Sequence, residues 1–480
     1  MYNDKKLLNI KRTSLKVNGM NYVITIDFGS TFTKIVVVSL AEKKIILSDK
    51  VASTVGIDAT ICLNQCYELA RTVLSEEEFQ NAKKLASSSA AGGLRMAVIG
   101  LTKSLSTLAG KAAALGAGAK IIANYSGRLT DEKMQRLEES NAEIILLCGG
   151  YERGNVSMVL ANANKIAGSK VKVPIIYSGN SELCHDIRCI MQSNHKKCYV
   201  VENIIPELNV LNVEPAQEVI RNLFLDRITD MKGFNVVKQE FDNQLIPTPK
   251  AVLTAGMLLN KGTENIEGFG PLLIVDIGGA TTDVYSFDEN RSFGGARPVG
   301  LAEPFAKRTV EGDLGMRESS GGVINENYIN EVIKDLGIEE EQLRKSIGNR
   351  IRNIDYLPDC EMERKIDDTI AKLAVYQALR RHAGCVKPSY NAKCQSIQVG
   401  KNITEVSKVI GTGGILVHNR NPIKIMKSAE KNYRDKGILL PEKIDGYLDT
   451  EYVLFSAGLL KEIDQDAAIE IMLKSIKQCQ

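Results

Sequence analysis

The stretch Asp27–Lys34 has the sequence Asp-Phe-Gly-Ser-Thr-Phe-Thr-Lys, and Asp276–Asp283, far later in the chain, has the sequence Asp-Ile-Gly-Gly-Ala-Thr-Thr-Asp. Each stretch follows an apolar run of strand type, Tyr22–Phe28 or Leu272–Ile277, and leads into a second such run. Both stretches therefore predict a hairpin in which an aspartate ends the first strand and small residues form the turn. The recurrence of the whole arrangement indicates a duplicated core.

The residue types in the two turns suit a phosphate chain. Glycine removes a side chain where the backbone must turn tightly, and turn amides and hydroxyls then face phosphate oxygens. Asp27 and Asp276 are predicted to organise a hydrated Mg²⁺, which neutralises phosphate charge and orients the attacking water. The predicted phosphate-binding residues are Gly29, Ser30, Thr31, Lys34, Gly278, Gly279, Thr281, Thr282 and Asp283. The alternative for Lys34 is a solvent-facing position on its strand, and the alternative for Asp283 is a turn residue behind the site.

A third glycine-rich turn lies in Val409–Leu416, where a predicted strand leads into an apolar segment that can open a helix. Such a turn lets the backbone pack flat against a purine or ribose. The predicted adenosine-binding residues are Gly411, Thr412, Gly413 and Gly414. The chain contains no Gly-x-x-x-x-Gly-Lys-Ser/Thr loop and no Gly-x-Gly-x-x-Gly fingerprint after its Met96–Leu101 strand, which argues against a P-loop NTPase and a dinucleotide oxidoreductase.

Charge and hydropathy exclude several other classes of protein. Lys plus Arg total 61 and Asp plus Glu total 58, a formal charge of +3 without a basic run, so we expect no nucleic-acid partner. The longest apolar stretches have strand length, well short of the roughly 20 residues that span a bilayer, and we expect no membrane segment and no signal peptide. None of the ten cysteines forms a Cys-x-x-Cys pair, which fits reduced thiols in a cytoplasmic protein.

A chain of 480 residues is expected to contain at least two domains. From Gly92 onward short apolar strands alternate with amphipathic helices, which predicts an inserted, parallel, doubly wound α/β subdomain. The expected parts are residues 1–91 as the first part of domain I, 92–235 as the inserted subdomain, 236–270 as a hinge with a connecting helix, 271–449 as domain II with the adenosine motif, and 450–480 as a connecting helix that returns to domain I.

The three motifs, in this order, resemble the phosphate 1, phosphate 2 and adenosine motifs of the actin/Hsp70/sugar-kinase superfamily. The resemblance implies an α/β fold in which two duplicated ribonuclease-H-like, actin-like ATPase domains flank a nucleotide cleft that takes ATP or ADP with Mg²⁺. It also implies two connecting helices that cross at the hinge, here Ala251–Leu259 and Tyr452–Leu460, each with an Ala-Gly pair that permits close contact. The inserted block lies outside this resemblance.

Three further stretches, Ala91–Met96, Arg308–Arg317 and Arg381–Gly384, resemble the MutL-type accessory ATPases of glutamate mutase, which are unrelated to the mismatch-repair protein of that name. This resemblance implies a slow ATPase that acts as a chaperone and reactivating factor for an adenosylcobalamin-dependent mutase, exchanging its damaged cobalamin. The mutase subunits would be its partners. Glu311 and Asp313 are expected in a loop, where they either complete the cleft or pair with Arg308 and Arg317.

The inserted block has the strand–helix alternation of a cobalamin-carrying subunit, but it lacks an Asp-x-His-x-x-Gly loop with a cobalt-ligating histidine. We therefore expect that the chain binds no cobalamin directly and that the block either docks beside the mutase's cobalamin domain, by mimicry, or is a plain structural insertion. The alternatives for the whole chain are an actin-fold small-molecule kinase, a filament-forming scaffold, and an activator ATPase of another radical enzyme, which would carry an iron–sulfur cluster.

Overall fold

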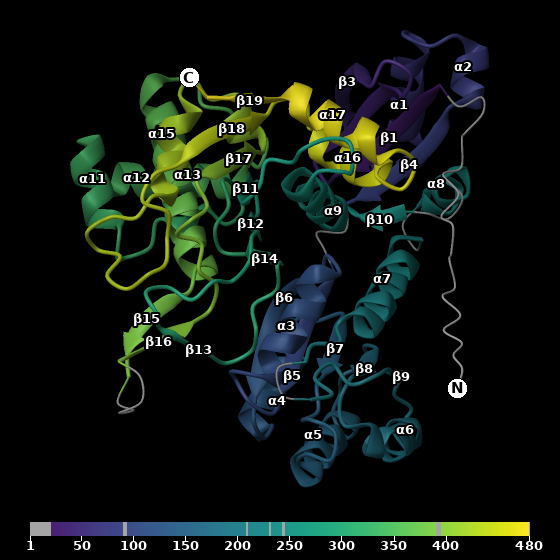
Figure 1. Ribbon diagram of the computed structural model, residues 1–480, viewed down its shortest axis with the longest axis vertical. Helices are drawn as coiled ribbons and strands as arrows, with labels where there is room; N and C mark the ends of the chain where they lie inside the picture. The colour runs from purple at the N-terminus through teal and green to yellow at the C-terminus, as the bar shows by residue number, and fades with distance from the viewer. Residues whose placement is uncertain are drawn as a thin grey trace, which may run out of the picture.

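The structure is a computed structural model that describes residues 21–89, 94–207, 210–229, 232–241, 245–389 and 395–479. Figure 1 shows two sheet-containing lobes side by side, here called lobe I and lobe II, and a third unit below them. This third unit, residues 94–229, is here called the insert. Ala91–Gly93, which include the predicted start of the inserted subdomain, lie outside the described residues.

Lobe I is built on one five-stranded sheet. Its strands, in spatial order, are β3 (Lys44–Ala52), β2 (Phe32–Ser39), β1 (Tyr22–Phe28), β4 (Lys83–Ser88) and β10 (Leu245–Pro247). The strands β1, β2 and β3 form an antiparallel meander, whereas β4 lies parallel to β1 and β10 lies parallel to β4. The helices that pack on the face with Ile24 and Ile26 are α1 (Ala59–Arg71), α2 (Glu76–Asn81) and α8 (Phe234–Glu240).

Lobe II repeats this strand order. Its strands, in spatial order, are β14 (Ala306–Glu311), β12 (Thr282–Phe287), β11 (Leu272–Ile277), β17 (Lys408–Thr412), β18 (Asp445–Asp449) and β19 (Ile476–Gln478). The strands β11, β12 and β14 form the meander, β17 and β18 follow in parallel, and β19 pairs antiparallel at the edge. Because two sheets with the same connectivity occur in one chain, the predicted duplicated, actin-like α/β fold is confirmed.

Helices on one face of the second sheet form the rest of lobe II. The central one, α13 (Glu361–His382), buries Ile366 and Ile370 against Val275 of β11 and Val409 of β17. The other lobe II helices are α10 (Ser320–Val323), α11 (Ile329–Leu336), α12 (Glu340–Arg352), α14 (Gly414–Val417), α15 (Pro422–Met426) and the 3₁₀ turn η2 (Lys427–Ala429). A small separate sheet has the spatial order β13 (Arg297–Val299), β16 (Ser396–Val399) and β15 (Cys385–Pro388).

The insert contains a fully parallel sheet. Its strands, in spatial order, are β6 (Lys120–Ser126), β5 (Arg95–Gly100), β7 (Ile144–Leu147), β8 (Ile175–Tyr177) and β9 (Cys198–Val200). One face is covered by α3 (Ser106–Gly116) and α7 (Glu214–Thr229), and the other by α4 (Asp131–Glu138), α5 (Val156–Ala167), and η1 (Ser181–Leu183) with α6 (Cys184–Ser193). Helices on both faces and the order 2-1-3-4-5 make this the predicted doubly wound unit.

Two helices cross between the lobes, α9 (Thr248–Lys261) and α16 (Val453–Leu460), and α17 (Gln465–Ser475) packs beside them. Both predicted Ala-Gly pairs lie at close contacts. A β-carbon at Gly458 would overlap the backbone carbonyl of Ala251, and one at Gly256 would overlap the ring of Phe287. Glycine is therefore required at the crossing because the helix backbones touch.

The residue boundaries of the predicted domains stay predictions. Within the described ranges, no helix combines the length and the apolar character that a membrane crossing needs.

The helix crossing generates a stability prediction. Gly458→Ala adds a methyl group where the Ala251 carbonyl already lies, so the helices must move apart. We expect the free energy of unfolding to fall by about 1–3 kcal/mol, the usual cost of overpacking. The matched control is Gly56→Ala, because Gly56 is exposed and a β-carbon there meets no atom within 4 Å. Urea unfolding measures both variants, and equal stability of the two would contradict the packing argument.

Candidate nucleotide-binding site

The first hairpin holds Asp27 in a fixed orientation. This carboxylate is 1% exposed, at the end of β1, directly opposite Lys34 of β2. Its Oδ1 accepts hydrogen bonds from the hydroxyls of Ser87, at 3.0 Å, and of Thr248, the first residue of α9. Its Oδ2 lies 3.6 Å from the Lys34 ammonium. One oxygen is therefore held by neutral donors, and the other faces a cation.

The second hairpin brings Asp276 toward the first. Asp276 lies opposite Asp283 in the β11–β12 pair. The pKa of Asp276 is raised to about 6, chiefly by burial and next by the carboxylate of Asp283, while Lys34 lowers it and Asp27 raises it to a smaller extent. Since Asp27 and Lys34 of the first hairpin both act on the Asp276 carboxylate, charged groups of the two hairpins lie near one another.

Lys34 points into this site and not outward from the strand. Its ammonium lies 4.7 Å from the ring centre of Tyr452. Burial lowers the pKa of Lys34, but Asp27, Asp276 and Asp449 together outweigh burial and hold that pKa above its ordinary value. The solvent-facing alternative for this lysine is therefore wrong.

Asp449 is a third carboxylate, which the sequence analysis missed. It ends β18, is 1% exposed and accepts hydrogen bonds from the amides of Val453 (2.7 Å) and Leu454 (3.3 Å) at the start of α16. Asp449 lies three residues before the N-cap of α16, Tyr452, so the usual N-cap pattern does not predict its role. Ser87 and Thr248 carried no sequence signal either, because their role depends on contacts with a distant strand.

The turn residues differ in how open they are. A β-carbon at Gly29 would lie 2.5 Å from the Phe32 carbonyl oxygen, so the first turn requires glycine. In the second turn, a β-carbon at Gly278 would lie 3.3 Å from a carbonyl oxygen, and one at Gly279 would have no neighbour closer than 3.8 Å. The exposed turn residues are Ser30, Thr31 and Gly279. The amides of Gly29 and Gly278 already donate to the carbonyls of Phe32 and Thr281, so the exposed Ser30, Thr31 and Gly279 are the turn residues that a ligand can reach.

The predicted adenosine turn packs on the second hairpin. Gly413 has a φ of +93°, and a β-carbon there would overlap the Ile277 carbonyl at the end of β11. Gly414 is exposed, with no atom within 4 Å of its β-carbon position. Thr412 is buried beside Asp276 in the β11–β17 pair. The open surface of this turn is therefore at Gly413 and Gly414.

Two of the predicted ligand-binding residues are corrected by the structure. Thr282 is fully buried, and its hydroxyl donates to the Leu314 carbonyl at 2.6 Å. Gly411 is buried inside β17, where a β-carbon would lie 2.8 Å from the side chain of Leu416 and 3.3 Å from that of Leu448. Both residues shape the strands behind the site, and neither presents a free group to a ligand.

The stretch after the second hairpin was predicted as a loop, and this is wrong for its first part. Arg308 and Glu311 belong to β14, which pairs antiparallel with β12 although its sequence shows no apolar–polar alternation. The alternative in which Glu311 and Asp313 pair with Arg308 and Arg317 is also wrong. Glu311 and Asp313 both pair with Arg381, at 2.8 and 2.6 Å, while Arg308 pairs with Asp283 and Arg317 with another helix.

Comparison with known proteins identifies the family. A family model described as MutL protein matches residues 23–476. Protein MutL of Clostridium tetanomorphum is 40% identical over 457 residues, which cover 95% of this chain and 99% of that protein. The chain belongs to the MutL protein family. The predicted family resemblance is thereby confirmed.

Solved structures similar to this MutL-family chain are remote in sequence. Gluconate kinase from Lactobacillus acidophilus has a TM-score of 0.33 and 9% identity, and covers 96% of this chain and 92% of its own. Xylulose kinase from Bifidobacterium adolescentis has a TM-score of 0.29 and 12% identity, and covers 96% of this chain and 95% of its own. The strand order of the two sheets, and not these scores, defines the architecture.

In this MutL-family chain a polar network fixes the residues around the second turn. The amides of Met316 and Arg317 donate to the carbonyls of Gly278 and Gly279, at 3.0 and 2.8 Å. The Arg317 guanidinium then pairs with Asp367 of α13, at 3.1 and 3.2 Å. The turn is therefore held by its own backbone and anchored to a helix of the lobe II core.

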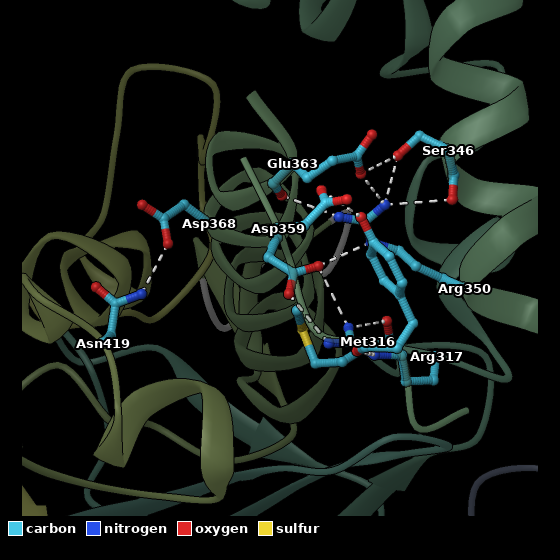
Figure 2. A network of polar contacts seen from close by, with 10 residues as sticks. Met316, Arg317, Ser346, Arg350, Asp359, Glu363, Asp368 and Asn419 are labelled. Atoms are coloured by element: carbon cyan, nitrogen blue, oxygen red, sulfur yellow. Dashed lines mark hydrogen bonds and ion pairs between the residues drawn. The ribbon is translucent and has the colours of Figure 1, made fainter. Parts of the chain in front are cut away.

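Figure 2 shows how the network continues. Arg350, fully buried on α12, donates to Asp367 at 2.8 Å and also contacts Glu363 and Ser346. The next residue of α13, Asp368, accepts a hydrogen bond of 2.7 Å from Asn419, which follows the adenosine turn. Two adjacent aspartates of α13 thus hold Arg317, next to the turn of the second hairpin, and Asn419, which follows the glycine-rich turn of Val409–Leu416.

The raised pKa of Asp449 generates a pH prediction for the nucleotide-free protein. Burial raises this pKa from 3.8 to about 6. The folded state therefore takes up a proton between about pH 6 and pH 4 that the unfolded state does not, so the stability contribution of Asp449 rises as the pH falls through this window. We expect the free energy of unfolding of the wild type, relative to Asp449→Asn, to increase by about 2–3 kcal/mol from pH 7 to pH 4.

Urea unfolding across this pH range measures the difference. Asp445→Asn, an exposed aspartate at the other end of β18, controls for removal of one negative charge from the same strand. A wild-type advantage over Asp449→Asn that stays constant with pH would contradict the buried, proton-accepting carboxyl.

Proposed function

We propose that this MutL-family chain binds ATP with Mg²⁺ between its two lobes and hydrolyses it slowly in the cytoplasm. In this proposal it is an accessory, reactivating factor for an adenosylcobalamin-dependent mutase, namely glutamate mutase. The observation that supports the ATPase part is that Lys34 pairs with Asp27 at 3.6 Å and also acts on the Asp276 carboxylate of the second hairpin. The mutase part rests on the resemblance to the accessory ATPases of glutamate mutase.

The donor set suits magnesium. Mg²⁺ in proteins is held by one or two carboxylates together with substrate phosphates and waters, and not by an all-protein cage. Among the described residues, no group of three or more His, Cys, Asp or Glu side chains is placed to hold a metal ion, whereas Asp27 and Asp276 supply the two carboxylates. Bound Mg²⁺ would neutralise phosphate charge and orient the attacking water.

The protein's own groups would position the phosphates. The exposed turn residues Ser30, Thr31 and Gly279 would donate to phosphate oxygens. Gly29 and Gly278 would shape the two turns, since their amides already donate to the carbonyls of Phe32 and Thr281. Lys34 pairs with carboxylates in the nucleotide-free site, and it would turn to a phosphate once Mg²⁺ takes over their charge. Gly413 and Gly414 would face the adenosine.

The insert would engage the client. It emerges from lobe I between β4 and β10, so closure of the lobes around ATP would change its position. In the proposal it docks beside the cobalamin-carrying mutase subunit and mimics that subunit's fold without binding cobalamin. ATP binding and hydrolysis would then drive exchange of the damaged cofactor, as a chaperone cycle does.

The first test is ATP hydrolysis by the purified protein with Mg²⁺. Asp27→Asn keeps the shape and the hydrogen-bond acceptor for Ser87 but removes the charge, and we expect its turnover to fall about a hundredfold or more. Asp49→Asn is the matched control, because Asp49 is exposed on β3 of the same sheet. Unchanged turnover in Asp27→Asn would overturn the assignment of the first hairpin.

The second arm adds a mutase that carries hydroxocobalamin. We expect faster ATP hydrolysis, and recovery of mutase activity on addition of adenosylcobalamin, with the wild-type chain but not with Asp27→Asn. An equal rate of ATP hydrolysis with and without the mutase would leave the ATPase part of the proposal standing and would exclude this mutase as the partner. Tight binding of cobalamin by the isolated chain, measured by absorbance after gel filtration, would reject the mimicry.

A further inference from the structure

The turn that joins α3 to β6 lies where the insert meets both lobes. It comprises Leu115–Ala119, and Figure 1 shows α3 rising from the insert toward β14 of lobe II. Its own geometry is tight. Ala119 donates its amide to the Ala114 carbonyl at 2.9 Å, and Gly118 has a φ of +93°. The turn therefore has a defined shape that can transmit a displacement.

On the lobe II side, one guanidinium joins this turn to the second hairpin. Arg308 is 8% exposed and donates through Nε and Nη2 to Asp283 Oδ1, at 2.8 and 2.7 Å. Its Nη1 donates to the Leu115 carbonyl at 3.1 Å and reaches the Ala119 carbonyl at 3.5 Å. Asp283 is the direct strand partner of Asp276. A single side chain thus bridges the candidate phosphate site and the insert.

On the lobe I side, the same turn contacts Pro247, the residue before Thr248, which holds Asp27 of the first hairpin. A β-carbon at Gly118 would lie 2.7 Å from Pro247, which ends β10. The next residue, Thr248, donates its hydroxyl to Asp27. The turn therefore lies between Pro247 and Arg308. Pro247 directly precedes Thr248, the donor to Asp27, and Arg308 pairs with Asp283, the strand partner of Asp276.

We infer that Arg308 is a positioning residue that couples the nucleotide state of the two hairpins to the position of the insert. This inference rests on the proposed ATP function. Mg²⁺ bound near Asp276 would weaken the repulsion between the carboxylates of Asp276 and Asp283. Closure of the lobes around the nucleotide would also move β14, because β14 pairs with β12 in lobe II. Arg308 donates hydrogen bonds both to Asp283 and to the carbonyl of Leu115 in the turn. A shift of Asp283 or of β14 would therefore also shift the end of α3.

Lysine cannot reproduce this bridge, because one ammonium cannot span both an aspartate and two carbonyls in a fixed fork. Arg308→Lys is therefore the informative variant. Arg380→Lys is its matched control. Arg380 is also buried, pairs with Asp435 through Nε and Nη2, and donates to the carbonyls of Ser428 and Glu430, but entirely within lobe II.

The experiment is amide hydrogen exchange of the full chain with and without Mg²⁺ and a non-hydrolysable ATP analogue, with analogue affinity measured by calorimetry. In the wild type and in Arg380→Lys we expect exchange of the amides in residues 115–126 to slow about tenfold on binding, the scale of one charge-assisted hydrogen bond. In Arg308→Lys we expect analogue binding without this slowing.

Every outcome is decisive. If the wild type binds the analogue and residues 115–126 do not respond, or if Arg308→Lys responds like the wild type, the coupling is wrong while the ATP function stands. If the wild type binds no analogue, both are wrong. If thermal unfolding shows that Arg308→Lys does not fold, Arg308→Gln replaces it, since its amide still donates to Asp283 but is too short to reach Leu115 as well.

Discussion

The close crossing of α9 and α16 sets the distance between the two hairpins, and the rest of the site depends on it. Gly458 lies directly on the backbone of Ala251, so the helices cannot approach further. Both helices also begin at the site: α9 starts with Thr248, which donates to Asp27, and the first amides of α16 donate to Asp449. Helix packing and site geometry are therefore parts of one arrangement.

Three carboxylates, of which Asp27 and Asp449 are buried, lie around one lysine and give the site an excess of negative charge. Each carboxylate is supported differently: Asp27 by two hydroxyls, Asp449 by backbone amides, and Asp276 mainly by Lys34. The pKa values of Asp276 and Asp449, both raised to about 6, are the electrostatic consequence of burial. A divalent cation such as Mg²⁺ would supply positive charge to such a site.

The position of the insert in the chain explains why it can respond to this site. The chain leaves lobe I after β4 and returns at α8, before β10, and Pro247 is the register partner of Ser88 in the neighbouring parallel strands β10 and β4. Ser87, one residue earlier, donates to Asp27. The insert is thus attached beside the first hairpin and held by Arg308 behind the second. In lobe II, helix α13 holds the residues next to the second hairpin and the glycine-rich turn, because its Asp367 pairs with Arg317 and its Asp368 accepts a hydrogen bond from Asn419.

The sequence by itself determined the hairpins, the strand–helix alternation of the insert and the two connecting helices, because each depends on apolar periodicity, glycine and turn residues within a few positions. Only the tertiary structure decided that Lys34 faces inward, that Thr282 and Gly411 are packing positions, and that Asp449 joins the site. It also reassigned the ion-pair partners of Arg308 and Glu311. These features depend on contacts between segments far apart in the chain, and the local sequence pattern is the same whichever partner the packing supplies.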